Sequence, residues 1–402
     1  MAWAEERNGQ YRVRFRREDN TVGSVTGVPD LDAAKNEIQE IEVEQRKGTW
    51  VDPVKKKVTL AEWVVEWWDA LDVDKRTLEN YQGIIKNHIL PKWGSTEIGD
   101  ISNIKVLTWL KEIRDVQGRA QVTVDGIKKL LSLILSDAAV DHLIPSNPIQ
   151  ARRRGRRSAI ARTKEQIWAE PHEVLRIADQ AAAVYSFSGA LLIVTAAWTG
   201  ARWGELTGLQ RPNLHLFDDD TGYFTVDPAI GALHESNRGL WLGPPKTEDS
   251  ARDVSLPPFL VRLLRIHLKT QEHRHVFTSL DNALHRRSNF SRRATRPAAD
   301  GNLAMRNPPV RLQPIKPGLK FHGLRHGHKT WMIEDLLPEV VQERRLGHKL
   351  PDKIAETYSH VGPQLEALVL TKLQQRWDNA VAEVDSRSDN DPSVNTLWRL
   401  AA

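Results

Sequence analysis

Two proline-containing, basic stretches interrupt the chain and limit most strongly what it can fold into. The first is "WVDPVKKKVTL", around residue 53, and the second is "PSNPIQARRRGRRSAIARTK", which ends at residue 164. Proline beside a run of like charges is typical of a connection rather than a packed element, and 402 residues exceed one ordinary core. We therefore predict domains at residues 1–52, 53–150 and 165–375, a basic linker at 151–164 and a polar C-terminal tail at 376–402.

The first domain has the pattern of a three-stranded sheet with one helix. In "QYRVRFRRE", apolar and basic residues alternate with the period of a half-buried strand. "EDNT" predicts a hairpin turn, "VGSVTG" a following strand, and "LDAAKNEIQEIEVEQRKG" a helix. The basic face of the strand is either solvated in the ordinary way or lies along a DNA groove, where guanidinium groups reach phosphates and guanine edges. Its residues are Arg12, Arg14 and Arg16.

The other two domains have mainly helical patterns. Residues 53–150 contain four segments whose apolar positions recur at three and four, which predicts a helical bundle. Residues 165–375 contain further helical segments, with "GYFTVDP" and "RDVSLP" as strands of a small sheet and "GPPKTEDSA" as the turn between two strands. The predicted fold class is therefore a multidomain, mainly α protein with a mixed α+β third domain. Four tryptophans on apolar stripes are predicted core residues: Trp63, Trp67, Trp68 and Trp109.

Charge is concentrated in the C-terminal half of the chain. Residues 151–375 carry a net charge of +10, whereas residues 61–150 carry −3, and such a block favours a polyanionic partner. The linker arginines are either merely solvated or form a strap around a duplex. They are Arg152, Arg153, Arg154, Arg156 and Arg157.

Composition excludes several classes of protein. The chain has no cysteine, which excludes disulfides, thiol catalysis and cysteine-ligated zinc. The chain has no run of eighteen apolar residues, so no membrane span is predicted. The start "MAWAEERNGQ" lacks the basic-then-apolar order of a secretory signal. We therefore expect a cytoplasmic protein.

Four short stretches of the third domain hold polar residues where apolar ones would be easier to bury. They contain Arg202 with Glu205 three positions later, then Lys246, then His322 with Arg325, and finally His348 with Tyr358. Each pair or residue alone has an ordinary structural interpretation, such as a surface ion pair, a solvated lysine or a core tyrosine. All four in one basic domain form a much more specific pattern.

The histidines of "FHGLRHGHKTWM" also raise the hypothesis of a metal site. His322 and His326 are four apart, the spacing of two zinc ligands on a helix. However, the intervening residues include Arg325 rather than a glutamate, and an arginine beside a cation is unfavourable. We predict no metal, and we expect His326 and His328 to serve in packing or in contacts with the DNA backbone.

The motifs "TGARWGEL", "PKT..SARDVSLP", "HGLRHGH" and "LGH…Y" resemble the active-site motifs of the tyrosine recombinases, the phage-integrase family. Residues 53–150 resemble the core-binding domain of that family. Residues 1–48 resemble the arm-site-binding module of integrases from phages and integrative elements. The spacing from His348 to Tyr358 is about one residue longer than is common in the family, and Pro351 lies inside it.

The resemblance implies a role for each candidate residue. Arg202 and Arg325 would clamp the scissile phosphate, with Glu205 supporting the first arginine. Lys246 would be the lysine of a β-hairpin that protonates the leaving 5′ oxygen as general acid. The remaining implied residues are the two active-site histidines, His322 and His348, and the nucleophile, Tyr358.

This chemistry is consistent with the residue types. A tyrosine hydroxyl has an ordinary pKa near 10, so it needs nearby positive charge or a base to act as a nucleophile. Planar arginines can hold the phosphate oxygens in the transition state. A 3′-phosphotyrosyl bond keeps the energy of the broken linkage for rejoining. Neither ATP nor a metal ion is needed, so no cofactor is expected.

The resemblance implies a site-specific DNA recombinase that integrates or excises a phage genome or mobile element. Its implied partners are double-stranded core and arm attachment sites, further copies of itself in a synaptic tetramer, a DNA-bending host factor and an excisionase, at the nucleoid of a bacterial host. Alternatives are a Xer-like resolvase, a type IB topoisomerase-like strand transferase and a non-enzymatic DNA-binding regulator. The N-terminal module argues against the first of these, and the full set of catalytic residues argues against the last.

Overall fold

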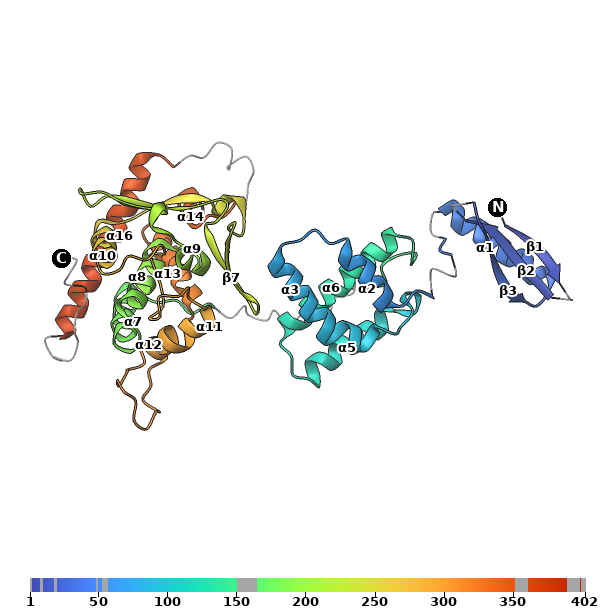
Figure 1. Ribbon diagram of the computed structural model, residues 1–402, viewed down its shortest axis with the longest axis horizontal. Coiled ribbons are helices and arrows are strands. Elements are labelled where there is room, and N and C mark those ends of the chain that lie inside the picture. Colours follow the sequence, from blue (N-terminus) through green and yellow to red (C-terminus); the bar gives the residue numbers. More distant parts are fainter. Residues whose placement is uncertain are drawn as a thin grey trace. The chain divides into compact units, whose positions relative to one another are not determined.

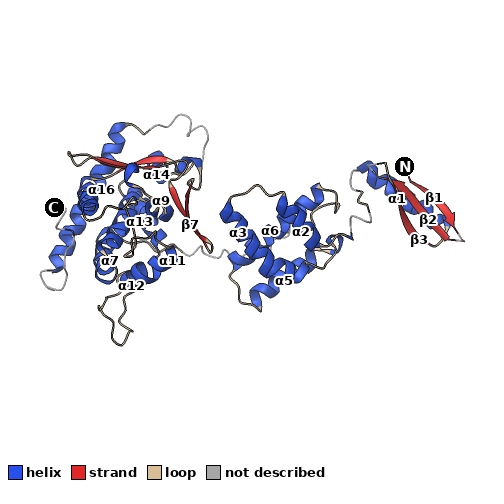
Figure 2. Cartoon of the chain, viewed as in Figure 1, coloured by secondary structure: helices blue, strands red, loops and turns tan. Residues whose placement is uncertain are grey.

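The protein is described from a computed structural model (Figure 1). It describes residues 2–7, 10–17, 20–47, 50–52, 57–149, 165–350, 361–388 and 398. The chain divides into two compact units, Met1–Ile160 and Ala161–Ala402, and the first of these contains two separate hydrophobic cores. Helices dominate and the sheets are small and antiparallel (Figure 2), which confirms the predicted fold class.

The N-terminal domain is a three-stranded antiparallel sheet packed on one helix. The strands β1 (Ala2–Arg7), β2 (Gln10–Arg16) and β3 (Val22–Val28) lie in sequence order, and α1 (Leu31–Lys47) follows. The alternation of β2 buries Val13 and Phe15 against the helix. The arginines of β2 consequently lie on the opposite face of the sheet.

The second domain is the expected helical bundle. Its helices are α2 (Leu60–Asp69), α3 (Lys75–Ile84), α4 (Leu90–Trp93), α5 (Asn103–Asp115) and α6 (Gln121–Val140), and a π-helical turn (Ile85–Ile89) joins α3 to α4. Helix α2 begins with a capping box, in which Thr59 and Glu62 satisfy each other's backbone N–H groups. The predicted core tryptophans are confirmed: three are buried and Trp68 packs partly buried against them.

The third domain is built around α8 (Phe187–Thr199), which is buried from Gly189 to its end. Helices α7 (Pro171–Val184) and α13 (Phe321–Glu334) pack against α8 (Figure 1). The other helices are α9 (Trp203–Thr207), α10 (Pro258–Lys269), α11 (Arg287–Phe290), α12 (Arg296–Asp300), α14 (Glu339–Leu346) and α16 (Pro363–Ser388), with a π-helical turn (Ser291–Thr295) between α11 and α12.

Two small sheets complete the third domain. The strands β4 (Leu214–Leu216), β5 (Gly222–Val226) and β8 (Arg252–Ser255) form one sheet, and β6 (Ala232–Ser236) pairs with β7 (Gly239–Gly243) in the other. The predicted strands at "GYFTVDP" and "RDVSLP" are therefore confirmed and pair with each other. The hairpin β6–β7 was not predicted.

The predicted position of Lys246 at a hairpin tip is wrong. The hairpin turn lies between Ser236 and Gly239, and Lys246 lies in the connection from β7 of one sheet to β8 of the other. The reason is the pair Pro244–Pro245, since proline has no N–H for the strand ladder and therefore ends β7 at Gly243.

The predicted polar tail at 376–402 also needs correction, because α16 continues to Ser388. Its residues Trp377, Ala380 and Val384 are buried in the core of the third domain, and Trp398 is buried there as well. The spacing of three and four between these apolar positions is that of a helix face, which the polar composition of the segment masks.

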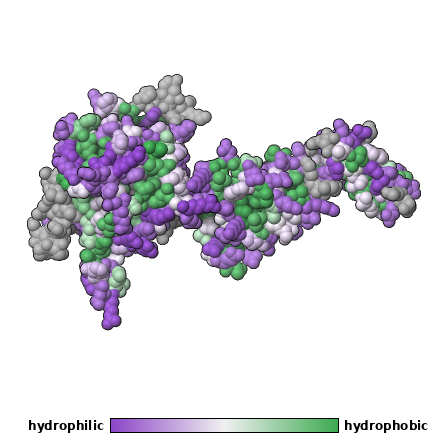
Figure 3. All heavy atoms as spheres, viewed as in Figure 1, coloured by the Kyte–Doolittle hydropathy of each residue, from purple (hydrophilic) through white to green (hydrophobic). Residues whose placement is uncertain are grey.

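Apolar and polar side chains are interspersed over the visible surface of the described domains (Figure 3). Within the described ranges, no helix combines the length and the apolar character needed to cross a bilayer.

Candidate active site

Arg202 is positioned by a sharp turn between two helices. Helix α8 ends at Gly200, whose φ of 65° is left-handed. A Cβ there would lie 2.6 Å from the His328 ring and 2.7 Å from Leu346, so only glycine fits. Two residues later, the backbone N–H of Arg202 donates to Glu205 Oε2 (2.9 Å) and α9 begins. A polar side chain thereby lies three residues beyond a helix that is buried from Gly189 to its end.

Glu205 holds two arginines rather than one. Its Oε1 accepts from Arg202 Nη1 (2.8 Å) and its Oε2 from Arg252 Nη2 (3.1 Å), and the side chain is 2% exposed. Burial alone would raise the pKa of Glu205, but the two guanidinium groups outweigh it and hold that pKa below its usual value. Glu205 is therefore an ionised buried acid, as its predicted supporting role requires.

Arg252 was not a candidate from the sequence. It lies on β8, and besides Glu205 it donates to the carbonyl oxygens of Ser250 (2.7 Å) and Arg345 (2.8 Å). Its side chain is 8% exposed. The one sequence signal for a role of Arg252 was its place directly after "KT..SA" in the same motif. Its position on an alternating strand gave no such signal, because such a strand normally presents an arginine to solvent.

Arg325 is buried on α13, with 5% of its surface exposed. Its Nη1 donates to the carbonyl of Gly200 (2.7 Å) and its Nη2 to the carbonyl of Leu346 (2.6 Å). Burial, with the nearby charge of Arg202, lowers the pKa of Arg325 to about 9. The guanidinium therefore remains charged at neutral pH.

The turn after α14 ties the two predicted clamp arginines together. Leu346 accepts from Arg325, and the next carbonyl, that of Gly347, accepts from Arg202 Nη2 (3.2 Å). The side chain of His348 then reaches Arg325, with 2.6 Å between its Nε2 and Arg325 Nη2. Residues distant in the sequence thereby meet at one point.

Arg202 and Arg325 both have N–H groups that the described residues leave free to donate to a ligand. A guanidinium has five N–H groups. Arg202 uses three, on Glu205, Ser250 (2.7 Å) and Gly347, and Arg325 also uses three. Two N–H groups of each guanidinium therefore have no partner among the described residues, and the side chain of Arg202 is 22% exposed. A tetrahedral oxyanion can accept from both.

The histidines of α13 divide into two kinds. His322 is exposed one turn before Arg325, and its ring lies 4.9 Å from that of His326. Desolvation and the surrounding charges of His326, Arg325 and Arg202 lower the pKa of His322 to about 4. His328 is fully buried, with its Nδ1 on the Ala197 carbonyl (2.9 Å), so it is a packing residue as expected.

The metal hypothesis gains no support from the geometry. In the part of the chain that the structure describes, no three His, Asp or Glu side chains gather closely enough to hold a metal ion. The site is instead lined by guanidinium groups.

Lys246 is exposed and makes no hydrogen bond within the described residues. Both flanks of its loop are anchored, however. His234 Nε2 donates to the Pro244 carbonyl (2.8 Å) on one side, and Thr247 Oγ1 lies 2.9 Å from Ser250 Oγ on the other. Since Ser250 also contacts Arg202, the loop is connected to the arginine pair.

Some of the predicted residues lie outside the described part of the chain. These are Tyr358 and the linker arginines Arg152, Arg153, Arg154, Arg156 and Arg157.

The arginines of β2 are only partly free. Glu5 on β1 accepts from Arg12 (2.9 and 3.0 Å) and also from Arg14, whereas Arg16 is exposed at the end of the strand. The predicted row of three is therefore a row in which a carboxylate orients two members.

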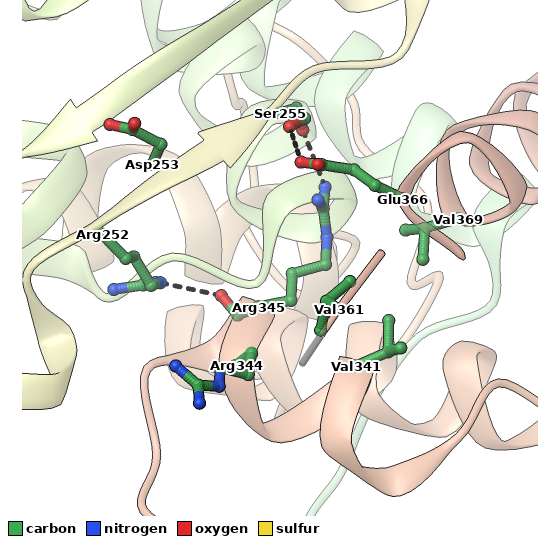
Figure 4. Close-up of a pocket in the computed structure, with 9 residues that line it drawn as sticks. All are labelled: Arg252, Asp253, Ser255, Val341, Arg344, Arg345, Val361, Glu366 and Val369. Carbon is green, nitrogen blue, oxygen red and sulfur yellow. Dashed lines mark hydrogen bonds between the residues drawn. The ribbon is translucent and has the colours of Figure 1, made fainter. Parts of the chain in front are cut away.

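A pocket of about 330 Å³ lies beside the arginine network, between β8, α14 and α16 (Figure 4). Arg252 reaches from β8 to the backbone of α14, and Arg345 reaches back to the Ser255 carbonyl (3.1 Å). These two contacts fix α14, and with it His348, against the sheet.

Integrases are similar to this chain along most of its length. Residues 59–114 match the model of the phage integrase N-terminal SAM-like domain. The prophage phiRv2 integrase of Mycobacterium tuberculosis is 25% identical over 79% of this chain and 79% of its own. The ICEBs1 integrase of Bacillus subtilis is 24% identical over 91% of this chain and 97% of its own.

A solved structure extends the likeness to the fold. A lambda integrase tetramer bound to a Holliday junction superposes with a TM-score of 0.51 and 20% identity, covering 89% of this chain and 94% of that one. The domain match and the relatives show that the chain is similar to integrases of phages and integrative elements, and the solved structure shows that it shares their fold.

Proposed function

We propose that this protein is a site-specific DNA recombinase, an integrase that cuts and rejoins DNA through a covalent 3′-phosphotyrosyl intermediate on Tyr358. The observation that carries the proposal is the arginine pair. Arg202 and Arg325 are brought together by one turn, and each retains two N–H groups without a partner among the described residues. Such a pair fits the non-bridging oxygens of one phosphodiester.

In the proposed reaction, the Tyr358 hydroxyl loses its proton to solvent as its oxygen attacks phosphorus, and these N–H groups stabilise the charge that develops on the phosphate. The P–O bond to the 5′ carbon's oxygen breaks, and Lys246 gives that oxygen a proton. His322, exposed one turn before Arg325, adds a further donor beside the phosphate, and His348 contacts Arg325 through its Nε2. A 5′-hydroxyl then attacks the phosphotyrosyl bond, releases the tyrosine and rejoins the strand.

Glu205 has a structural part in this reaction. Charges that are preorganised need not be rearranged in the transition state, and Glu205 fixes the guanidinium of Arg202 while also neutralising part of the positive cluster. Without the Glu205 carboxylate, the guanidinium groups of Arg202, Arg252 and Arg325 would repel one another.

We also propose how the parts of the chain divide DNA binding. Residues 53–150 and 165–375 bind the core site, the basic linker at 151–164 crosses the duplex between them, and residues 1–52 bind a separate arm site. Attachment at two sites raises the effective concentration of the core-binding parts. Exposed arginines from α11 to α12 support DNA contact by the third domain, and they include Arg287, Arg292, Arg293 and Arg296.

Besides DNA, the proposed partners are further copies of this chain and regulatory proteins. The lambda integrase compared above is a tetramer on a Holliday junction, and we propose that this chain also self-associates on DNA. A DNA-bending host factor and an excisionase would regulate the direction of recombination at the nucleoid of a bacterial cell, in integration or excision of a phage genome or mobile element.

A suicide substrate tests the proposed reaction. The substrate is a nicked duplex with the attachment site taken from the junction of the integrated element, so that the cleaved end diffuses away. We expect a covalent protein–DNA adduct in the presence of EDTA, and its absence with Tyr358→Phe. An adduct that persists in that variant, or one that requires a divalent ion, refutes the mechanism. Relaxation of plasmids without the site indicates the topoisomerase-like alternative.

A further inference from the structure

His348 lies between a carboxylate and a guanidinium. Its Nδ1 is 2.6 Å from Glu343 Oε2, and its Nε2 is 2.6 Å from Arg325 Nη2. A guanidinium N–H can only donate, so the Nε2 of His348 must accept with its lone pair. The proton of the neutral ring is therefore on Nδ1, and it is donated to Glu343. The two neighbours together fix one tautomer.

The doubly protonated ring does not fit this arrangement. A proton on Nε2 would point at an N–H of Arg325 at the same short distance. Desolvation and the charge of Arg325 accordingly lower the pKa of His348, although Glu343 opposes the shift. His348 is therefore neutral at pH 7.

Glu343 is held in place for this contact. The residue is 6% exposed, and its second oxygen accepts from Lys329 Nζ (2.6 Å). Burial raises its pKa, but Lys329 and His348 outweigh the burial and leave the pKa of Glu343 below its usual value. The backbone N–H of His348 also donates to the Glu343 carbonyl (3.0 Å), so the end of α14 fixes the distance between the two residues.

We propose that Glu343 is a positioning residue for Arg325 and that it acts by holding His348 in its Nδ1–H tautomer. Its catalytic consequence rests on the proposed function; the tautomer itself does not. Neutral imidazole in water favours the Nε2–H tautomer. Without Glu343, the His348 proton would move to Nε2 and point at an N–H of Arg325. The guanidinium of Arg325 would then turn away from the phosphate.

The inference predicts a loss of rate rather than of DNA affinity. Affinity for a duplex comes from many phosphate contacts spread over the protein, whereas Arg325 orientation affects only the reacting phosphate. We expect Glu343→Ala to cleave on the order of 10- to 100-fold more slowly, the loss typical when the orienting partner of a functional histidine is removed. Glu343→Gln retains an oxygen that accepts from Nδ1–H and should cleave within about threefold of the wild type.

The test combines ¹⁵N-histidine NMR of the full chain with single-turnover cleavage of the nicked attachment-site duplex. The His348 signals are identified by their loss in His348→Asn. We expect the Nδ1–H tautomer in the wild type and in Glu343→Gln, and the Nε2–H tautomer in Glu343→Ala. Glu339→Gln, an exposed acid on the same helix, is the matched control and should change neither signal nor rate.

Three results would overturn the inference: an Nε2–H or doubly protonated His348 in the wild type, an unchanged tautomer in Glu343→Ala, or wild-type cleavage by that variant. If Glu343→Ala does not fold, the spectra of the wild type and of Glu343→Gln still show which His348 tautomer is present. A wild-type protein that cleaves no site refutes the proposed function instead, and the tautomer then remains a separate test.

Discussion

Glu205 is a buried acid that holds two arginines, Arg202 and Arg252. Removing one partner of a buried ion pair leaves charge uncompensated and typically costs about 3–5 kcal/mol. We therefore expect Glu205→Ala to lower the free energy of unfolding by roughly that amount, measured by urea denaturation of the full chain. Glu339→Gln should change it by less than about 0.5 kcal/mol. Equal small effects of both substitutions would contradict the role assigned to Glu205.

His328 makes stability depend on pH. Its folded-state pKa is well below 6.5 because the ring is buried and faces Arg345 (3.0 Å), so between these values only the unfolded state binds the proton. The corresponding stability is fully present above pH 6.5 and is lost as the pH falls below it. We expect His328→Asn to reduce the slope of unfolding free energy between pH 6 and 5 by up to about 1.4 kcal/mol per pH unit. An unchanged slope would contradict this.

At the scale of elements, the turn from α8 to α9 determines where the first arginine lies. Gly200→Ala requires a left-handed alanine, which costs about 1–2 kcal/mol, and its Cβ would press on His328 and Leu346. We expect lower stability and a cleavage rate that falls further than stability alone explains, because Arg202 moves. As a control, Gly126→Ala on α6 meets no atom within 4 Å and should be neutral or stabilising. Cleavage at the wild-type rate by Gly200→Ala would refute the role of the turn.

The elements that could be predicted are those with a clear apolar period. The helices of residues 60–140 and the strands at 222–226 and 252–255 have it, whereas α8 is recognisable as a long apolar run that is buried on all sides. The hairpin β6–β7 does not, because Gly239–Gly243 is half-buried on both faces and its alternation is lost. The end of α16 was missed because its buried Trp377, Ala380 and Val384 are separated by polar residues.

Arg202 and Arg325 became candidates through the family resemblance of their motifs, and the structure brings both to the turn after α14. Arg252 and Glu343 could not be found in this way. In sequence, Arg252 has the place of a solvent-facing strand residue, and Glu343 is one acid among the basic residues of α14, which is typical of surface ion pairs. Only the tertiary structure buries them against Glu205 and His348.

At the scale of the whole molecule, the N-terminal domain has a hydrophobic core of its own. We expect deletion of residues 1–52 to leave cleavage of an isolated core site within about threefold of the wild type while abolishing arm-site binding, since the two sites are linked only through effective concentration. Gel-shift assays with core and arm duplexes measure this. Undiminished arm binding by the truncated protein would refute the domain assignment.

Arg202 and Arg325 are proposed to act on the negative charge of one phosphate, and a substrate without that charge tests this most directly. A methylphosphonate at the scissile position replaces a charged oxygen with a methyl group. We expect Arg202→Ala to cleave the normal phosphate about 10²- to 10³-fold more slowly than the wild type, yet to cleave the methylphosphonate within about tenfold of the wild type, because no charge then needs the arginine. An equal loss on both substrates would contradict the phosphate clamp.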